Sequence, residues 1–269
     1  MKDTGVENRI NETLNRIKNR FLVFSGKGGV GKSTVAANLG LVLSERGFKV
    51  GLLDVDIHGP NLPKILGVEK QRMAVIGPNR ILPVSINRKM KLVSMGFLLE
   101  RDDLPVIWRG PLKMRAIQQF LGDVEWGTID YLIVDSPPGT GDEPLSIAQI
   151  IPATGAIIVT TPQEVSLLDS KKAISFAARL NLKIIGLIEN MSGFLCPHCG
   201  GSIDLFKTGG GERLAKEMGV PFLGRIPIDP GMVESGDRGI PYVIERPDAP
   251  AARALNGIVE DILKRGGGE

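Results

Sequence analysis

Short apolar segments rich in β-branched residues alternate along the chain with longer segments whose apolar residues recur at helical spacing. The short segments predict strands over 21–25, 49–54, 91–95, 131–135, 156–161, 183–188 and 221–226. Several of them are apolar at consecutive positions, which is typical of strands in a parallel sheet that is covered on both faces.

The longer segments predict helices over 32–46, 112–121, 145–151, 166–180, 211–218 and 251–264. Repeated strand–helix pairs favour right-handed crossover connections. We therefore expect an α/β fold: a single doubly wound domain over residues 21–265, with a mostly parallel sheet of about seven or eight strands and helices on both faces. Residues 1–20 carry Ile10, Leu14 and Ile17 at helical spacing and predict a lead-in helix. Residues 266–269 predict a flexible tail.

The composition of the 269 residues is that of a globular protein, with 42% hydrophobic and 23% charged residues. The net charge of +3 gives no argument for a nucleic-acid partner. No apolar run approaches the roughly 18 residues of a membrane span, and no signal peptide opens the chain. The two cysteines exclude a disulfide scaffold. A cytoplasmic protein without nucleic-acid or membrane partners is expected.

A glycine-rich run lies between the first predicted strand and the helix that follows it. It reads Gly26-Lys27-Gly28-Gly29-Val30-Gly31-Lys32-Ser33, and Thr34 comes next. The run satisfies the phosphate-loop pattern G-x-x-x-x-G-K-[ST], in which glycines let backbone N–H groups face the phosphates. Lys32 would reach the β- and γ-phosphates of ATP, and the Ser33 hydroxyl would bind Mg²⁺. These residues predict a P-loop NTPase that binds ATP and Mg²⁺.

Acidic residues stand where two of the predicted strands end. Asp54 and Asp56 follow the second strand, and Asp135 ends the apolar strand 131–135. Because the carboxyl ends of parallel strands open onto the ligand crevice, we expect all three beside the phosphate loop. An apolar strand ending in Asp is the Walker B arrangement, in which the Asp135 carboxylate holds Mg²⁺ through its water shell. A carboxylate of the first pair can orient a water, the alternative being a helix-capping or turn aspartate.

The cysteines, Cys196 and Cys199, form a C-x-x-C loop followed by glycines. One interpretation is a redox dithiol, although such a pair normally opens a helix after the first strand of a compact domain. The other is a metal site, and both zinc and an iron–sulfur cluster take about four ligands. His198 is a possible third ligand, but its place inside the loop directs it away. Two chains at a two-fold axis would supply four thiolates, which predicts a homodimer.

The segment 27–34, Lys-Gly-Gly-Val-Gly-Lys-Ser-Thr, resembles the deviant Walker A motif of the MinD, ParA and nitrogenase iron-protein class. The resemblance implies that Lys27 crosses a dimer interface to the partner's nucleotide. It also implies that Asp56 positions the attacking water and that Asp54 is its partner on the Mg²⁺ side. The segment Asp-Ser-Pro-Pro-Gly-Thr-Gly-Asp after the Walker B strand looks like the switch segment of this class.

Three further residues gain a role only from this resemblance. Asn190, Pro227 and Asp229 match positions that contact the adenine ring by a side-chain amide and by backbone groups. From the residues alone they are ordinary turn residues that follow predicted strands.

Segments 108–111, 161–164, 189–192 and 209–212, together with Cys-Pro-His-Cys, are similar to the Mrp/ApbC branch of this class. The similarity extends from about residue 21 to about residue 263. It implies a slow ATPase that carries a [4Fe–4S] cluster between two subunits. Such a protein receives the cluster from assembly machinery and transfers it to iron–sulfur apoproteins.

Two alternatives would use the same nucleotide residues. A positioning ATPase of the MinD or ParA kind would need a basic amphipathic membrane helix or a basic surface patch, and the sequence shows neither. The second alternative is a nucleotide-switched dimer in which the cysteine pair holds a structural zinc, because zinc also accepts tetrahedral thiolate ligation.

Overall fold

The central sheet is built from eight strands in the order β12-β9-β8-β1-β7-β2-β6-β5. The computed structural model describes residues 4–98, 110–196 and 199–266, so Trp108, Arg109 and His198 lie outside the described residues. Within the described sheet, β5 alone runs antiparallel to its neighbour. The strands are β1 (Ile17–Ser25), β2 (Val50–Asp54), β5 (Val84–Ser85), β6 (Met90–Ser94), β7 (Ile129–Asp135), β8 (Gly155–Thr160), β9 (Ile184–Glu189) and β12 (Phe222–Arg225).

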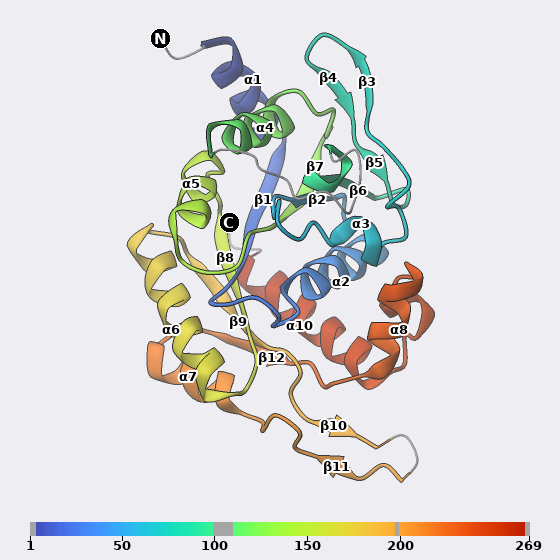
Figure 1. The fold of residues 1–269 in the computed structure, drawn as a ribbon, viewed down its shortest axis with the longest axis vertical. Coiled ribbons are helices and arrows are strands. Elements are labelled where there is room, and N and C mark those ends of the chain that lie inside the picture. Colours follow the sequence, from blue (N-terminus) through green and yellow to red (C-terminus); the bar gives the residue numbers. More distant parts are fainter. Residues whose placement is uncertain (1–3, 99–109, 197–198, 267–269) are drawn as a thin grey trace.

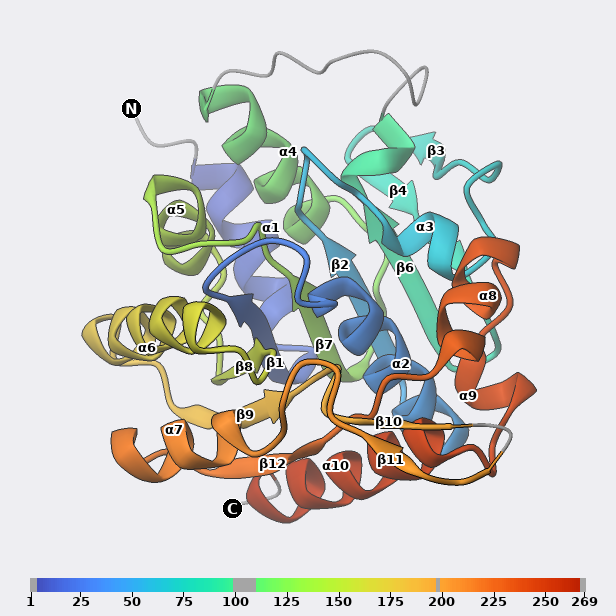
Figure 2. The same cartoon turned by 60° about the horizontal axis from the view of Figure 1, so that its bottom comes forward.

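Helices cover both faces of this sheet, which confirms the predicted doubly wound α/β fold (Figure 1). One layer contains α2 (Lys32–Glu45), α3 (Leu62–Ile65), α9 (Tyr242–Glu245) and α10 (Pro250–Gly266). The other contains α1 (Thr4–Leu14), α4 (Gly110–Gly122), α5 (Asp142–Ile150), α6 (Glu164–Arg179) and α7 (Gly210–Met218). The helix α8 (Pro230–Arg238) packs on α3 and α9. Figure 2 shows α2 beside α10, with which it packs.

Strand β1 shows why both helical layers are needed. Its residues Phe21 and Val23 pack into the layer of α2, whereas Leu22 and Phe24 pack into the opposite layer. All four side chains are at most 1% exposed. Burial of apolar surface contributes about 25 cal/mol per Å². A strand that is apolar on both faces is therefore stable only when helices cover both, and the crossovers supply those helices.

The predicted lead-in helix over 1–20 is wrong at its C-terminal end, because α1 ends at Leu14 and β1 begins at Ile17. Ile17 pairs with Ile129 of β7, and Lys18 forms an ion pair with Asp130 at 2.7 Å. Strand pairing overrides the helical spacing of the apolar residues here. The predicted tail over 266–269 is also wrong at its first residue, since α10 includes Gly266.

Several short elements have no counterpart in the predictions. They are α3, α8, α9, the edge strand β5, the 3₁₀ turn η1 (Met95–Leu98), and the hairpins β3–β4 (Ala74–Gly77, Arg80–Leu82) and β10–β11 (Phe194–Leu195, Ser202–Ile203). The two hairpins project from opposite ends of the molecule (Figure 1). None of the described helices is both long enough and apolar enough to cross a bilayer.

Candidate functional site

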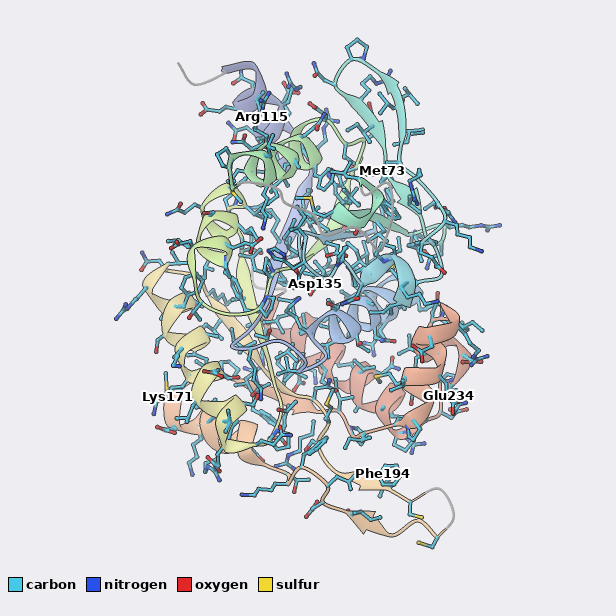
Figure 3. All side chains as sticks on the ribbon, in the orientation of Figure 1. Met73, Arg115, Asp135, Lys171, Phe194 and Glu234 are labelled. Carbon is cyan, nitrogen blue, oxygen red and sulfur yellow. The ribbon has the colours of Figure 1, made fainter. Side chains whose placement is uncertain are left out.

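Polar residues gather where the central strands end. Asp54, the last residue of β2, is in register with Asp135 of β7 on one side and with Ser94 of β6 on the other. Ser25 ends the neighbouring strand β1. All four are at most 1% exposed. Figure 3 shows Asp135 near the middle of the molecule, where the carboxyl ends of the parallel strands define the crevice.

The phosphate loop connects β1 to α2 and lines a cavity of about 430 Å³. Every residue from 27 to 34 contributes to the cavity wall. Gly29 and Gly31 have φ angles of 81° and 82°, in the left-handed region that favours glycine. Gly26 does not line the cavity. A Cβ on this residue would lie 2.2 Å from the backbone carbon of Asp169, so Gly26 allows α6 to pack against the loop.

Lys32 and Asp135 form a buried ion pair, with the Lys32 Nζ 2.5 Å from the Asp135 Oδ1. The other carboxylate oxygen, Oδ2 of Asp135, has no hydrogen-bond partner among the described residues, nor do the hydroxyls of Ser25 and Ser136. Buried polar atoms are normally satisfied, so these atoms mark a place where a polar ligand belongs. A carboxylate oxygen and hydroxyl groups are suitable ligands for Mg²⁺ or its hydration shell, and the lysine suits phosphate. The residues present fit Mg²⁺ and a nucleotide phosphate.

The two aspartates after β2 have different surroundings. The Asp54 carboxylate accepts hydrogen bonds from the Ser94 hydroxyl at 3.0 Å and from the backbone N–H of Leu62 at 3.3 Å, and it does not line the cavity. Burial, followed by repulsion from Asp135, raises the pKa of Asp54 well above its ordinary value. Asp54 therefore fixes the loop after β2 from inside.

Asp56 lines the cavity and also stabilises a turn. Its Oδ1 accepts hydrogen bonds from the backbone N–H groups of His58 and Gly59, at 3.2 and 3.3 Å. Burial raises its pKa, against the attraction of Lys32. Asp56 therefore stabilises the turn after β2, as the alternative interpretation of the sequence predicts, and its side chain also lines the cavity of the phosphate loop.

Asn190 contacts the phosphate loop directly. Its side-chain Nδ2 donates to the backbone carbonyl of Val30 at 2.9 Å, and a Cβ on Gly31 would lie 2.2 Å from the same nitrogen. The next residue, Met191, lines the cavity and has a φ of 55°, an uncommon value for a residue with a side chain. The loop after β9 therefore packs tightly against the phosphate loop.

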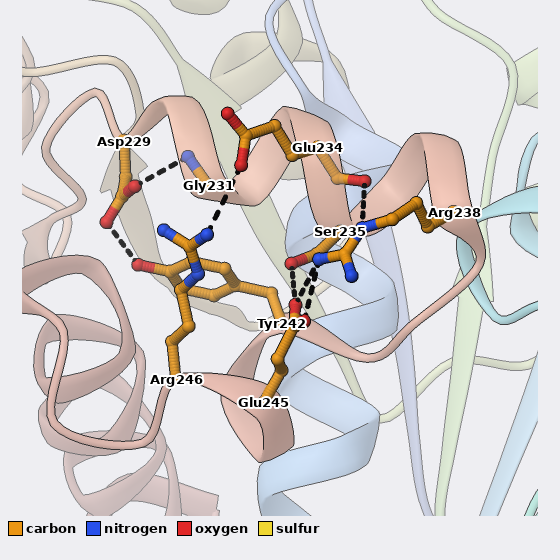
Figure 4. Close-up of polar contacts among 8 residues, drawn as sticks. All are labelled: Asp229, Gly231, Glu234, Ser235, Arg238, Tyr242, Glu245 and Arg246. Atoms are coloured by element: carbon orange, nitrogen blue, oxygen red, sulfur yellow. Dashed lines mark hydrogen bonds and ion pairs between the residues drawn. The ribbon is translucent and has the colours of Figure 1, made fainter.

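Pro227 and Asp229 do not line the cavity. Asp229 is the N-cap of α8, where its Oδ1 accepts from the backbone N–H of Gly231 at 2.8 Å. Its Oδ2 accepts from the Tyr242 hydroxyl at 2.5 Å (Figure 4). Burial, helped by this hydrogen bond, raises the pKa of Tyr242. Asp229 joins α8 to α9 in this structure.

The cavity has a second wall that the sequence does not predict. It consists of residues from α3, α8 and α9 and the segments beside them, namely Asn61, Lys64, Ile65, Met232, Val233, Gly236, Asp237, Ile240, Pro241 and Tyr242. No local motif marks these residues, because they come from elements that the sequence pattern did not predict. The mostly apolar character of this wall suits the flat face of a nucleotide base.

The cysteine pair lies at the end of the β10–β11 hairpin, on which Figure 3 labels Phe194. The Cys196 N–H donates to the Gly201 carbonyl at 2.9 Å, which closes the turn. Cys196 is half-buried and Cys199 is exposed. The described residues contain no cluster of three or more metal-binding side chains, so this chain offers two thiolates without a third described ligand nearby.

Apolar side chains of the hairpin that carries the cysteine pair, and of the segment after β11, face solvent. Leu195 and Leu205 are 47% and 57% exposed, and Ile203 and Phe206 are 45% and 41% exposed. An exposed apolar group of this kind on a projecting arm is typical of an interaction surface.

The base of this hairpin is held by Glu189, a fully buried residue at the end of β9. Its carboxylate accepts hydrogen bonds from the backbone N–H of Gly209 at 2.8 Å, from the N–H of Gly211 and from the Ser192 hydroxyl. Gly209 precedes α7, so the carboxylate also meets the positive end of that helix.

Comparisons with known proteins show the family of this chain. Residues 16–263 match the ParA family described as NUBPL iron-transfer P-loop NTPase. The chain is 55% identical over 259 residues to the iron–sulfur cluster carrier protein of Methanocaldococcus jannaschii, covering 96% of this chain and 88% of that protein. It is 46% identical over 252 residues to the cytosolic Fe-S cluster assembly factor NUBP2 of Bos taurus, covering 92% and 93%.

Solved structures show the same fold. A nucleotide-binding protein from Archaeoglobus fulgidus in complex with ADP superposes with a TM-score of 0.80 at 39% identity, over 92% of this chain and 95% of that chain. The MinD cell division protein of Aquifex aeolicus superposes with a TM-score of 0.67 at 25% identity, over 91% and 97%.

Proposed function

The chain belongs to the ParA family of NUBPL iron-transfer P-loop NTPases, and on that premise we propose that it hydrolyses ATP slowly and carries a [4Fe–4S] cluster between two copies of itself. The observation that carries the proposal is the combination of a phosphate-loop cavity with a projecting hairpin that ends in two thiols. The cluster is cargo, received from assembly machinery and handed to iron–sulfur apoproteins.

In the nucleotide site, Lys32 binds the β- and γ-phosphates, and the loop residues from Lys27 to Thr34 hold the phosphates through their N–H groups, while Gly26 lets α6 pack against the loop. Ser33 and Asp135 would hold Mg²⁺, which neutralises charge that develops on the phosphates during hydrolysis. Asp56 positions the attacking water, and Asp54 supports it. The adenine would lie against the wall made by residues of α3, α8 and α9. Contacts of Asn190, Pro227 and Asp229 with the adenine would require a rearrangement on nucleotide binding, because none of the three lines the cavity.

In the dimer, Cys196 and Cys199 of each copy supply the four thiolates that a [4Fe–4S] cluster takes. The exposed apolar residues on and after the hairpin support a contact between two hairpins. Lys27 lines the cavity and is half-buried, and in the dimer it would reach the nucleotide of the partner subunit. ATP binding then tightens the dimer and changes the exposure of the thiolates, so that nucleotide state controls retention of the cluster.

The test is the iron, acid-labile sulfide and zinc content of protein purified without oxygen, for the wild type and for Cys196→Ala. About four iron and four sulfide per dimer are expected for the wild type, with loss of both in the variant. Zinc in place of iron, with no cluster uptake on anaerobic reconstitution, would favour the nucleotide-switched dimer with a structural clamp. The absence of any metal from both proteins would favour the alternative function, a positioning ATPase of the MinD or ParA kind.

Release of phosphate by the wild type and by Lys32→Ala tests the nucleotide half of the proposal separately. Equal cluster transfer with ATP, with ADP and with the Lys32→Ala protein would refute the coupling of hydrolysis to transfer.

A further inference from the structure

A lysine outside the cavity connects the two loops that flank the nucleotide phosphates. The Nζ of Lys113, on the first turn of α4, lies 3.0 Å from Nε2 of His58 and 3.0 Å from Oε1 of Glu143. His58 follows β2, and Glu143 lies in the first turn of α5, after β7. The lysine side chain is 12% exposed, so it is inserted between the loops and does not extend into solvent.

Each of these contacts leads to a residue of the candidate hydrolytic site. The backbone N–H of His58 donates to Asp56, so a displacement of His58 moves the carboxylate that faces the cavity. Glu143 lies in the first turn of α5, the helix that follows the loop after Asp135. Lys113 itself does not line the cavity, and its side chain contacts His58 and Glu143 outside it.

We propose that Lys113 is a positioning residue for ATP hydrolysis, which holds the loops after β2 and β7 in the arrangement that aligns Asp56 with the Mg²⁺-binding Asp135. This role rests on the proposed ATPase activity and concerns the hydrolytic step, not nucleotide affinity. Because His58 is 65% exposed and Glu143 is 28% exposed, water replaces the lost contacts when the lysine is removed. The contacts of Lys113 therefore fix the positions of the loops after β2 and β7 more than they raise the free energy of unfolding.

The experiment compares kcat for phosphate release with the affinity for a fluorescent ADP analogue in wild type, Lys113→Met, Lys113→Arg and Lys172→Met. Lys172 is the matched control, a lysine on α6 that pairs with Asp169 and is 69% exposed. Lys113→Met is expected to lower kcat about 10- to 100-fold, because a small misplacement of a catalytic group has an effect of that size. The dissociation constant for the ADP analogue stays within about twofold, and Tm within about 3 °C. Lys113→Arg restores part of kcat, and the control leaves all values unchanged.

An unchanged kcat in Lys113→Met, beside an active wild type, would overturn the inference and leave the proposed function intact. A parallel loss of kcat, affinity and Tm would overturn it as well, because it would show a structural role. A wild-type protein that releases no phosphate would instead overturn the proposed hydrolysis, and with it any role of Lys113 in that step.

Discussion

Replacement of Glu189 by glutamine tests whether a single buried carboxylate holds the base of the cysteine hairpin. Glutamine has almost the same shape, but one of its terminal atoms is an NH₂ group. The carboxylate of Glu189 accepts a hydrogen bond from the N–H of Gly209 and another from the N–H of Gly211. In the variant, the NH₂ group would face one of these two N–H groups, and two donors cannot form a hydrogen bond. One charge-assisted hydrogen bond would be lost, and a buried N–H would lose its partner.

The expected cost follows from these contacts. A hydrogen bond to a charged group contributes about 1.5–3 kcal/mol, and the negative charge at the N-terminus of α7 adds about 0.3–1 kcal/mol. We expect Glu189→Gln to lower the free energy of unfolding by ~2–4 kcal/mol. For a domain of this size the loss corresponds to a Tm lower by about 5–15 °C.

Urea denaturation measures this loss, and hydrogen exchange shows whether the hairpin amides lose protection before the sheet does. The matched control is Glu217→Gln, in the last turn of the same helix. Glu217 is 54% exposed and pairs with Lys171 of α6, so its replacement should cost less than about 1 kcal/mol. Equal and small costs for the two variants would refute the conclusion that Glu189 holds the hairpin base.

Two further predictions concern other contacts of the described residues. Burial alone would raise the pKa of Asp130, but hydrogen bonds from Lys18 and from a backbone N–H outweigh it and lower the pKa below its ordinary 3.8. Asp130→Asn should therefore cost about 1 kcal/mol at neutral pH, and urea denaturation in acid should show this difference disappear as the pH falls through the lowered pKa of the folded state. Gly31→Ala places a Cβ 2.2 Å from Asn190 Nδ2 at a φ of 82°, whereas Gly29→Ala meets nothing within 4 Å at a φ of 81°. Titration with a fluorescent ADP analogue should show at least about a tenfold weaker affinity for the first variant than for the second; equal affinities would contradict the packing argument.

The sheet could be predicted because its strands are long and apolar on both faces. The segments around Leu22, Leu52 and Ile133 are fully buried or nearly so, and a short segment that is apolar at consecutive positions is recognisable as a buried strand from its composition alone. The end of α1 could not be predicted, because Ile17 satisfies helical spacing with Leu14 and yet pairs with β7. Whether such a residue is helical or in a strand depends on its contacts with segments that are distant in the sequence.

The candidate site likewise has a part that the sequence predicts and a part that it does not. The phosphate loop and the carboxylate Asp135 follow motifs with fixed spacing, and the structure places them at one edge of the sheet. The wall that includes Met232 and Tyr242 comes from short helices whose sequence shows no such spacing. The contact between His58 and Lys113 joins residues 55 positions apart, a relation that no local pattern contains.

The two ends of the cysteine hairpin are attached close to one place on the body of the protein. The Gly193 carbonyl accepts from the Ile228 N–H, and the Gly209 N–H donates to Glu189. None of the described residues between 194 and 208 belongs to either hydrophobic layer. Because the two ends of the hairpin lie close together, the entropic cost of closing it on folding rises only slowly with the number of residues between them. The length of the hairpin is therefore only weakly constrained by the folding of the body, and a shorter or longer hairpin should leave the sheet and the phosphate-loop cavity in place.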